Sequence, residues 1–199
     1  MQLRPALRLA TAVALIAGCT TPFVDVWKSP DWSGPPFRNV LVVGQAQSEV
    51  VRRAYEDALC ARLAAIGVRA EPSYGLLPGE KLEREAIAHA LAAGGNDGLI
   101  TARLVGVDQR ATYVPGSPGP VAARQAGWRT WDGFYQPGTV RIDQVARIET
   151  QVWALPGQGT MVWAGSSEKV NPRDIPRVAR ALADATVSTL QKTGVLPGS

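Results

Sequence analysis

The sequence has too few histidines and cysteines for the commonest catalytic and metal-binding sites. Among its 199 residues it has one histidine, His89, and two cysteines, Cys19 and Cys60. A serine–histidine–aspartate site needs a histidine as its base, and no Gly-x-Ser-x-Gly motif is present. Structural zinc sites use about four histidine or cysteine ligands. We therefore interpret His89 as a surface residue of a helix, and we expect no catalytic residue, no cofactor and no bound metal.

Motifs that bind phosphate or exchange protons are missing as well. The run Gly-Gly-Asn-Asp-Gly at 94–98 precedes an apolar segment, and no Lys-Ser or Lys-Thr pair follows it. We interpret it as a helix end and tight turn, not as a P-loop. The sequence also has three nearby acidic residues, Glu80, Glu83 and Glu85. We interpret them as acidic residues that stabilise the first turns of a helix, and not as the catalytic carboxylate pair of a glycosidase. The basic residues are scattered at a net charge of +4, so we expect no nucleic-acid partner. Because the sequence has no recognisable catalytic constellation, we also expect that the protein is not an enzyme.

Long apolar runs are rare, and the most prominent one lies at the N-terminus. Arg4 and Arg8 accompany an apolar segment at residues 9–17, which is shorter than the roughly 20 residues that span a bilayer. The segment ends in Ile16-Ala17-Gly18-Cys19, a pattern that resembles a bacterial lipobox. The resemblance implies cleavage before Cys19 and acylation of that cysteine with fatty acids such as palmitate. An ordinary signal peptide with a chance cysteine, or a buried helix, are the alternatives.

The lipobox resemblance also divides the chain. Residues 1–18 would be the signal peptide, residues 19–37 a lipidated tether partly packed on the domain, and residues 38–199 one α/β domain. Thr20, not Asp, follows the cysteine, which in Gram-negative lipoproteins implies the periplasmic face of the outer membrane. In other bacteria the anchor would hold the protein at the extracytoplasmic face of the cell membrane. Cys60 would be the one thiol left, half-buried and structural, with no disulfide partner.

Hydrophobic periodicity predicts an α/β fold of mixed α+β type, in the order β-α-β-α-β-loop-β-β-α. The apolar run at 38–46 is typical of a strand covered on both faces. The pattern at 48–66 predicts a helix that exposes Arg52, Arg53, Glu56 and Asp57 and buries its small apolar residues Val50, Val51, Ala54, Ala58, Ala61 and Ala65. Further strands are predicted at 68–76, 99–107 or as far as 114, 139–155 and 160–170, and further helices at 80–93 and 172–193. We expect one mixed sheet in the order 2-1-3-4-5, with helices mostly on one face and a short extra strand at 23–27.

Residues 115–138 interrupt this pattern with an aromatic loop that is rich in Gly and Pro. Trp128, Trp131, Phe134 and Tyr135 lie within eight positions. Aromatic side chains in a long loop fold back as a lid, remain disordered or form a surface for a partner. We identify these four residues as candidate binding residues for a glycan or a protein.

Several structural motifs resemble a class of small, uncharacterised proteobacterial outer-membrane lipoproteins. They are Trp27-Lys28-x-Pro30, Gly34-Pro35-Pro36-Phe37-x-x-Val40-Leu41-Val42-Val43, Ile148-Glu149-Thr150-x-Val152-Trp153 and Val162-Trp163. The resemblance implies an α/β domain on a lipid tether, with an aromatic loop before a long hairpin. The class has no assigned activity, so the resemblance supplies no catalytic residues.

We therefore predict a membrane-anchored periplasmic lipoprotein of a non-enzymatic binding, assembly or envelope-accessory type. Its partners would be the membrane, through the lipid, and an envelope protein or a cell-wall or surface polymer. The alternatives are an envelope hydrolase with an unrecognised site and an auxiliary subunit of an envelope transport complex. Converging carboxylates in a deep polar pocket, or a serine beside His89, would favour the hydrolase.

Overall fold

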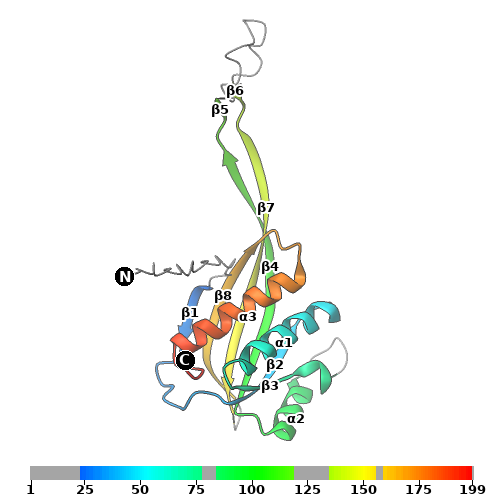
Figure 1. Cartoon of the computed structure of the whole chain (residues 1–199), viewed down its shortest axis with the longest axis vertical. Helices are drawn as coiled ribbons and strands as arrows, with labels where there is room; N and C mark the ends of the chain where they lie inside the picture. The colour runs from blue at the N-terminus through cyan, green and yellow to red at the C-terminus, as the bar shows by residue number, and fades with distance from the viewer. Residues whose placement is uncertain (1–22, 78–83, 119–134, 156–158, 199) are drawn as a thin grey trace, which may run out of the picture.

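The computed structural model describes residues 23–77, 84–118, 135–155 and 159–198, and it shows an α/β body with a long projecting arm (Figure 1). The main sheet has six strands in the order β1-β8-β7-β4-β2-β3. β2 is parallel to β3 and β4, and the other neighbours are antiparallel, so the fold is mixed α+β as predicted. The strands are β1 (Phe23–Lys28), β2 (Asn39–Gln45), β3 (Arg69–Pro72), β4 (Gly98–Val114), β7 (Thr139–Ala154) and β8 (Thr160–Val170).

Helices cover both faces of β2, which explains its continuous apolar sequence. Val42 lies in the core beneath α1 and α3, together with Leu59. Leu41 points to the opposite face and packs with Ala90 of α2. Two of the three described helices therefore lie on one face of the sheet, as expected. Their bounds are α1 (Glu49–Ala64), α2 (Arg84–Gly94) and α3 (Ile175–Lys192).

The five strands predicted between residues 38 and 170 are present, and they keep the order 2-1-3-4-5. The observed sheet differs in one detail, because β1 adds a sixth strand at the edge beside β8. β3 ends at Pro72, earlier than predicted, because the 3-10 turn η1 (Ser73–Gly75) follows it. β4 takes the longer of the two predicted lengths and reaches Val114.

The predicted buried face of α1 was wrong in part. Ala54 and Ala58 do pack against the core as half-buried residues, but they do not form its centre. The larger side chains of Tyr55, Leu59 and Leu63, four positions apart, face the core. Val50 is 74% exposed, and Ala61 and Ala65 are exposed as well. Small alanines bury too little area to orient a helix, whereas leucine and tyrosine each remove a large apolar surface from water. As a result Arg52 and Glu56, expected in solvent, are buried.

Aromatic residues attach the N-terminal segment to the sheet. The ring of Phe23 in β1 meets the ring of Trp163 edge-on at 5.2 Å. Trp32 stacks on Phe37 at 5.3 Å, and Phe37 is buried. Trp27 is 45% exposed. The described chain is therefore held to the body from its first residue onward.

β4 and β7 continue past the other strands and form the arm (Figure 1). Val170, the last residue of β8, pairs with Val145, and beyond this pair β7 has β4 as its only described neighbour. We refer to residues 107–114 and 139–146 as the arm. Further out, β5 (Ser117–Pro118) and β6 (Tyr135–Gln136) pair as a separate small sheet.

Candidate functional site

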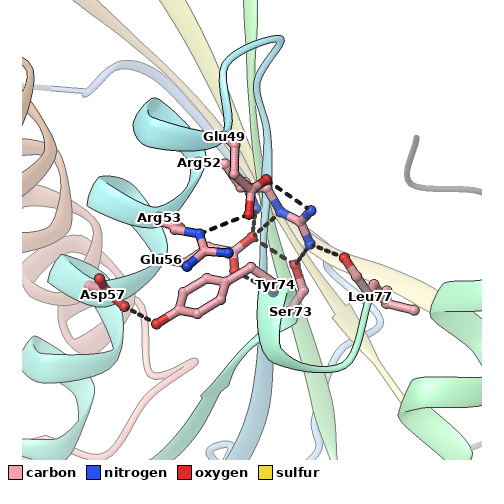
Figure 2. A network of polar contacts seen from close by, with 9 residues as sticks. Glu49, Arg52, Arg53, Glu56, Asp57, Ser73, Tyr74 and Leu77 are labelled. Atoms are coloured by element: carbon pink, nitrogen blue, oxygen red, sulfur yellow. Dashed lines mark hydrogen bonds and ion pairs between the residues drawn. The ribbon is translucent and has the colours of Figure 1, made fainter. Parts of the chain in front are cut away.

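A buried carboxylate, Glu56, lies where the parallel strands β2 and β3 end (Figure 2). Its Oε1 accepts hydrogen bonds from the backbone N–H of Gly44 at 2.8 Å, from Arg52 Nε at 3.1 Å and from Ser73 Oγ at 2.7 Å. Its Oε2 accepts the backbone N–H of Tyr74 at 3.0 Å. We refer to these five residues as the Glu56 network.

Arg52 is the cationic member of the Glu56 network and is 1% exposed. Its Nη2 donates to Ser73 Oγ at 2.9 Å and to the carbonyl oxygen of Leu77 at 3.0 Å. Its Nη1 lies 3.5 Å from Glu49 Oε2. Removing two charges from water costs several kcal/mol per ion unless hydrogen bonds replace the water. These contacts replace it, so the pair is tolerated in the core.

A second layer of contacts covers the solvent side of the Glu56 network. Arg53 Nε donates to Glu49 Oε1 at 2.9 Å, and its guanidinium lies 4.7 Å from the centre of the Tyr74 ring. Tyr74 donates its hydroxyl to Asp57 Oδ1 at 2.6 Å, and this hydrogen bond raises the pKa of Tyr74. Figure 2 shows these side chains converging from α1 and η1.

The Glu56 network is built to hold the fold together. Ligands of α/β proteins bind at the carboxyl ends of parallel strands, and this network occupies that edge. Glu56 already accepts four hydrogen bonds from the protein, so its carboxylate is committed to the fold. The sequence carried a signal for it, since Arg52 and Glu56 are four residues apart on a helix. The Glu56 network was nevertheless missed, because both residues were predicted to be exposed.

The glycine-rich run at 94–98 is a structural turn, as predicted. Gly95 has a φ of 59°, a conformation that glycine adopts without strain. The carboxylate of Asp97 accepts the backbone N–H groups of Arg38 at 2.8 Å and of Asn39 at 3.0 Å. The turn connects α2 to β4 along the chain, and its hydrogen bonds hold it against the start of β2.

Most of the predicted site residues lie outside the part of the chain that the structure describes. Cys19, Trp128, Trp131 and Phe134 lie outside the described residues, and Tyr135 is described only by its backbone, which pairs with Pro118 in the small sheet. The candidate binding residues therefore stay a prediction. In the sequence, Trp128, Trp131 and Phe134 fall between β5 and β6, and Tyr135 is the first residue of β6.

The other reactive side chains have ordinary structural environments. His89 is exposed on α2, as predicted. Cys60 is a free, half-buried cysteine, and burial, with smaller contributions from Glu56, Asp57 and Glu71, raises the pKa of its thiol to about 12. Among the described residues, no group of three or more histidine, cysteine, aspartate or glutamate side chains is arranged to hold a metal ion.

Asn171 fastens the base of the arm to the body. It follows β8 with a φ of 49°, and its Oδ1 accepts the backbone N–H of Gln144 at 2.9 Å. Its Nδ2 donates to Asp143 Oδ1 at 2.8 Å, and Asp143 Oδ2 accepts from Arg141 Nε at 3.0 Å. The hydrogen bond from Asn171, followed by that from Arg141, lowers the pKa of Asp143.

One face of the arm is charged and continues onto the body. Glu168 of β8 accepts from Arg110 of β4 at 3.0 Å and from Arg147 of β7 at 3.3 Å. Arg147 also lies 3.4 Å from Asp108. These contacts join all three strands across the base of the arm, and the hydrogen bonds from Arg110 and then Arg147 lower the pKa of Glu168.

The opposite face of the arm is apolar and exposed. Cross-strand pairing sets Tyr113 opposite Val140 and Ala111 opposite Ile142. Tyr113, Val140 and Ile142 are 65%, 64% and 63% exposed. A two-stranded ribbon has no second layer on which to bury such side chains. We refer to the exposed apolar residues on this side as the apolar face of the arm, and we include Leu104, which lies just inside the base of the arm. They are Leu104, Val107, Ala111, Tyr113, Val140 and Ile142. The pair Gln109–Gln144 lies among them.

No protein-family model and no curated protein matches the chain. Several solved structures are similar to it at low identity, and they include the following three. The PelC dodecamer from Paraburkholderia phytofirmans is 12% identical, with 82% of this chain and 93% of that chain covered and a TM-score of 0.42. Lipoprotein GNA1162 from Neisseria meningitidis is 12% identical, with coverages of 78% and 99% and a TM-score of 0.36. A PDZ domain protein from Parabacteroides distasonis is 9% identical, with coverages of 85% and 35% and a TM-score of 0.41. At these TM-scores the likeness carries no functional argument.

Proposed function

We propose that this protein is a lipid-anchored, non-enzymatic accessory of the bacterial envelope. Acylation at Cys19 would attach it to the outer membrane, where it would bind an envelope protein or a cell-wall or surface polymer. The observation that carries the proposal is the N-terminal arrangement, in which a lipobox-like sequence at residues 16–19 is followed after a short tether by a chain that docks at Phe23.

The charged side chains buried in the body support the proposal, because they are hydrogen-bonded within the fold. The buried carboxylate Glu56 and the buried Arg52 bind each other and the backbone, and His89 is an exposed residue of α2. The described helices include none that is long and apolar enough to cross a membrane. The apolar side chains of the arm, in contrast, are exposed to solvent, which supports a contact with something outside the chain.

The lipid anchor is tested by replacing the acylated cysteine and comparing it with the second cysteine. Cys19→Ser should move the protein from the membrane fraction to the soluble fraction of bacterial cells. The matched control Cys60→Ala removes the other thiol and should stay in the membrane fraction. Mass spectrometry of the N-terminal peptide should show a processed chain that begins at an acylated Cys19. Retention of the Cys19→Ser variant in membranes would overturn the anchor.

The membrane and the partner need separate measurements. Separation of inner from outer membranes on a density gradient should place the protein with the outer membrane. Crosslinking of intact cells through the charged face of the arm, with a photoreactive residue at Thr112, should capture an envelope protein or polymer. A matched crosslinker at Arg62, on the outer surface of α1, should capture less. Equal capture from both positions would contradict a binding role for the arm.

A further inference from the structure

The lipid-anchored end of the chain lies at the same level of the sheet as the inner end of the apolar face. Phe23 pairs with Ser167 of β8, Ser167 pairs with Ile148 of β7, and Ile148 pairs with Leu104 of β4. β1 is antiparallel to β8, which runs toward the arm, so Phe23, the first described residue, lies at the end of β1 nearer the arm (Figure 1).

The tether is shorter than the arm. Cys19 precedes Phe23 by four residues, which span at most about 14 Å when fully extended. From Leu104 to Val114, β4 advances ten residues, or roughly 33 Å at the rise of a β-strand. A lipid attached to Cys19 therefore holds the membrane within about 14 Å of the middle of an elongated molecule.

This position restricts how the molecule sits on a bilayer. If the arm pointed straight at the membrane, its charged face with Arg110, Arg141 and Asp143 would enter the hydrocarbon, where charged side chains are costly. If the arm pointed straight away, the body would enter instead, with charged surface residues such as Arg62 and Asp184. The orientation that avoids both keeps the long axis close to the membrane surface and tilts the arm toward it. The arm extends past α1 and α3 and then meets the lipid before the charged outer surfaces of these helices do (Figure 1).

The two faces of the arm then decide which side touches lipid. Alternating residues give one mainly apolar face, with the single polar pair Gln109–Gln144, and one charged face, which is the asymmetry of a water–lipid interface. α1 and α3 pack on the same side of the sheet as the apolar face. The arm projects past the ends of both helices, so its outer part extends beyond them (Figure 1). We propose that the apolar face of the arm rests on the lipid of the membrane that holds Cys19. This inference depends on the lipid anchor proposed above.

The experiment places a fluorescent label on either face of the arm in the lipidated full chain. In a Cys60→Ala background, Ile142→Cys puts the label on the apolar face, and Thr112→Cys is the matched control on the opposite face. Both proteins are inserted into phosphatidylethanolamine–phosphatidylglycerol vesicles, with and without acyl chains that carry bromine as a quencher. We expect the label at residue 142 to shift its emission to the blue and to be quenched, and the label at residue 112 to keep its aqueous emission.

The outcomes separate this inference from the anchor. If the lipidated protein does not float with vesicles, the proposed anchor fails and the inference fails with it. If it floats and both labels keep their aqueous emission, the anchor stands and the lipid contact of the arm is overturned. If the label at residue 142 shifts to the blue only as the protein density rises and is not quenched by brominated lipid, a second copy of the chain covers the apolar face, and the inference is overturned as well.

Discussion

Arginine–carboxylate pairs occur in two regions of this protein, and the two regions differ in how much water reaches them. In the Glu56 network the side chains of Arg52 and Glu56 are 2% and 0% exposed. On the charged face of the arm and sheet, Arg110 is 58% exposed and Glu168 21%. The same chemical pair therefore contributes differently to stability in the two regions. Removing one partner of the buried pair leaves an uncompensated charge away from water, whereas water solvates the charge that remains at the exposed pair.

The sharpest test of this comparison removes one carboxylate from each region. Glu56→Ala would leave Arg52 buried without its main partner and should lower the free energy of unfolding by about 3–5 kcal/mol. Glu149→Ala, which removes the partner of the half-exposed Arg103, should cost less than about 1 kcal/mol. Urea unfolding followed by circular dichroism measures both. Equal losses would show that burial does not separate the two regions.

Cys60 reports whether the buried region opens. Burial raises the pKa of its thiol to about 12, so at neutral pH the thiolate that reacts with iodoacetamide is scarce. We expect alkylation of Cys60 in the native protein to be much slower than in the urea-unfolded chain, and clearly faster in the Glu56→Ala variant. A cysteine introduced at Thr112 on the arm should react rapidly in all cases. Rapid native alkylation of Cys60 would contradict the buried environment.

Asn171 tests the link between the two regions, since it ties the arm to the body. Asn171→Gly keeps the left-handed backbone conformation but loses both side-chain hydrogen bonds, so we expect a loss of about 1 kcal/mol. Asn171→Ala should lose about 1 kcal/mol more, because alanine is strained at this positive φ. Hydrogen exchange at the amide of Gln144 should accelerate in both variants. Unchanged exchange there would mean that Asn171 does not fasten the arm.

Acid should lower the free energy of unfolding through three carboxylates of the charged face of the arm and sheet. The folded-state pKa is lowered for Asp143 by Asn171, for Glu149 by Arg103 and for Glu168 by Arg110. A lowered pKa gives stability that is complete above the unfolded-state values of about 4 and is lost as the pH falls through the folded-state values. Unfolding curves between pH 6 and pH 2.5 should show this decline. The decline should be smaller in a Glu168→Gln variant, and an identical decline would remove Glu168 from the explanation.

The smallest effect on stability is expected on the apolar face of the arm. Ile142→Lys replaces an exposed side chain and should change the free energy of unfolding by less than about 0.5 kcal/mol. The same variant should lose the lipid contact proposed for the arm. A large loss of stability would show that Ile142 is buried against part of the chain.

Much of the fold could be predicted from local patterns, and the failures have physical causes. The apolar run of β2 and the alternation in β7 and β8 predicted strands that the structure confirms, because strand periodicity is set by which faces are covered. The buried face of α1 was predicted only in part, through Ala54 and Ala58, because alanine and valine were given the same weight as leucine and tyrosine. The Glu56 network was missed because its partners come from β2, α1 and η1, and no local pattern joins them.

The aromatic loop shows a different limit. Trp128, Trp131 and Phe134 were predicted as candidate binding residues from composition, and they lie outside the described residues. The apolar face of the arm was not predicted, although its residues alternate in the sequence. Its significance depends on the extension of β4 and β7 beyond the body, and a period of two does not reveal whether a neighbouring layer covers the face.

The sequence by itself determined the order of strands and helices, the covering of β2 on both faces and the lipobox resemblance at Cys19, because each depends on residues that are close together in the chain. Only the tertiary structure decided that Glu56 and Arg52 are buried, that Asn171 holds the arm, and that Phe23 enters the sheet level with Leu104. These features depend on which distant segments meet and on how much water they exclude when they do. Local sequence sets the elements, whereas desolvation and register between distant segments set their roles.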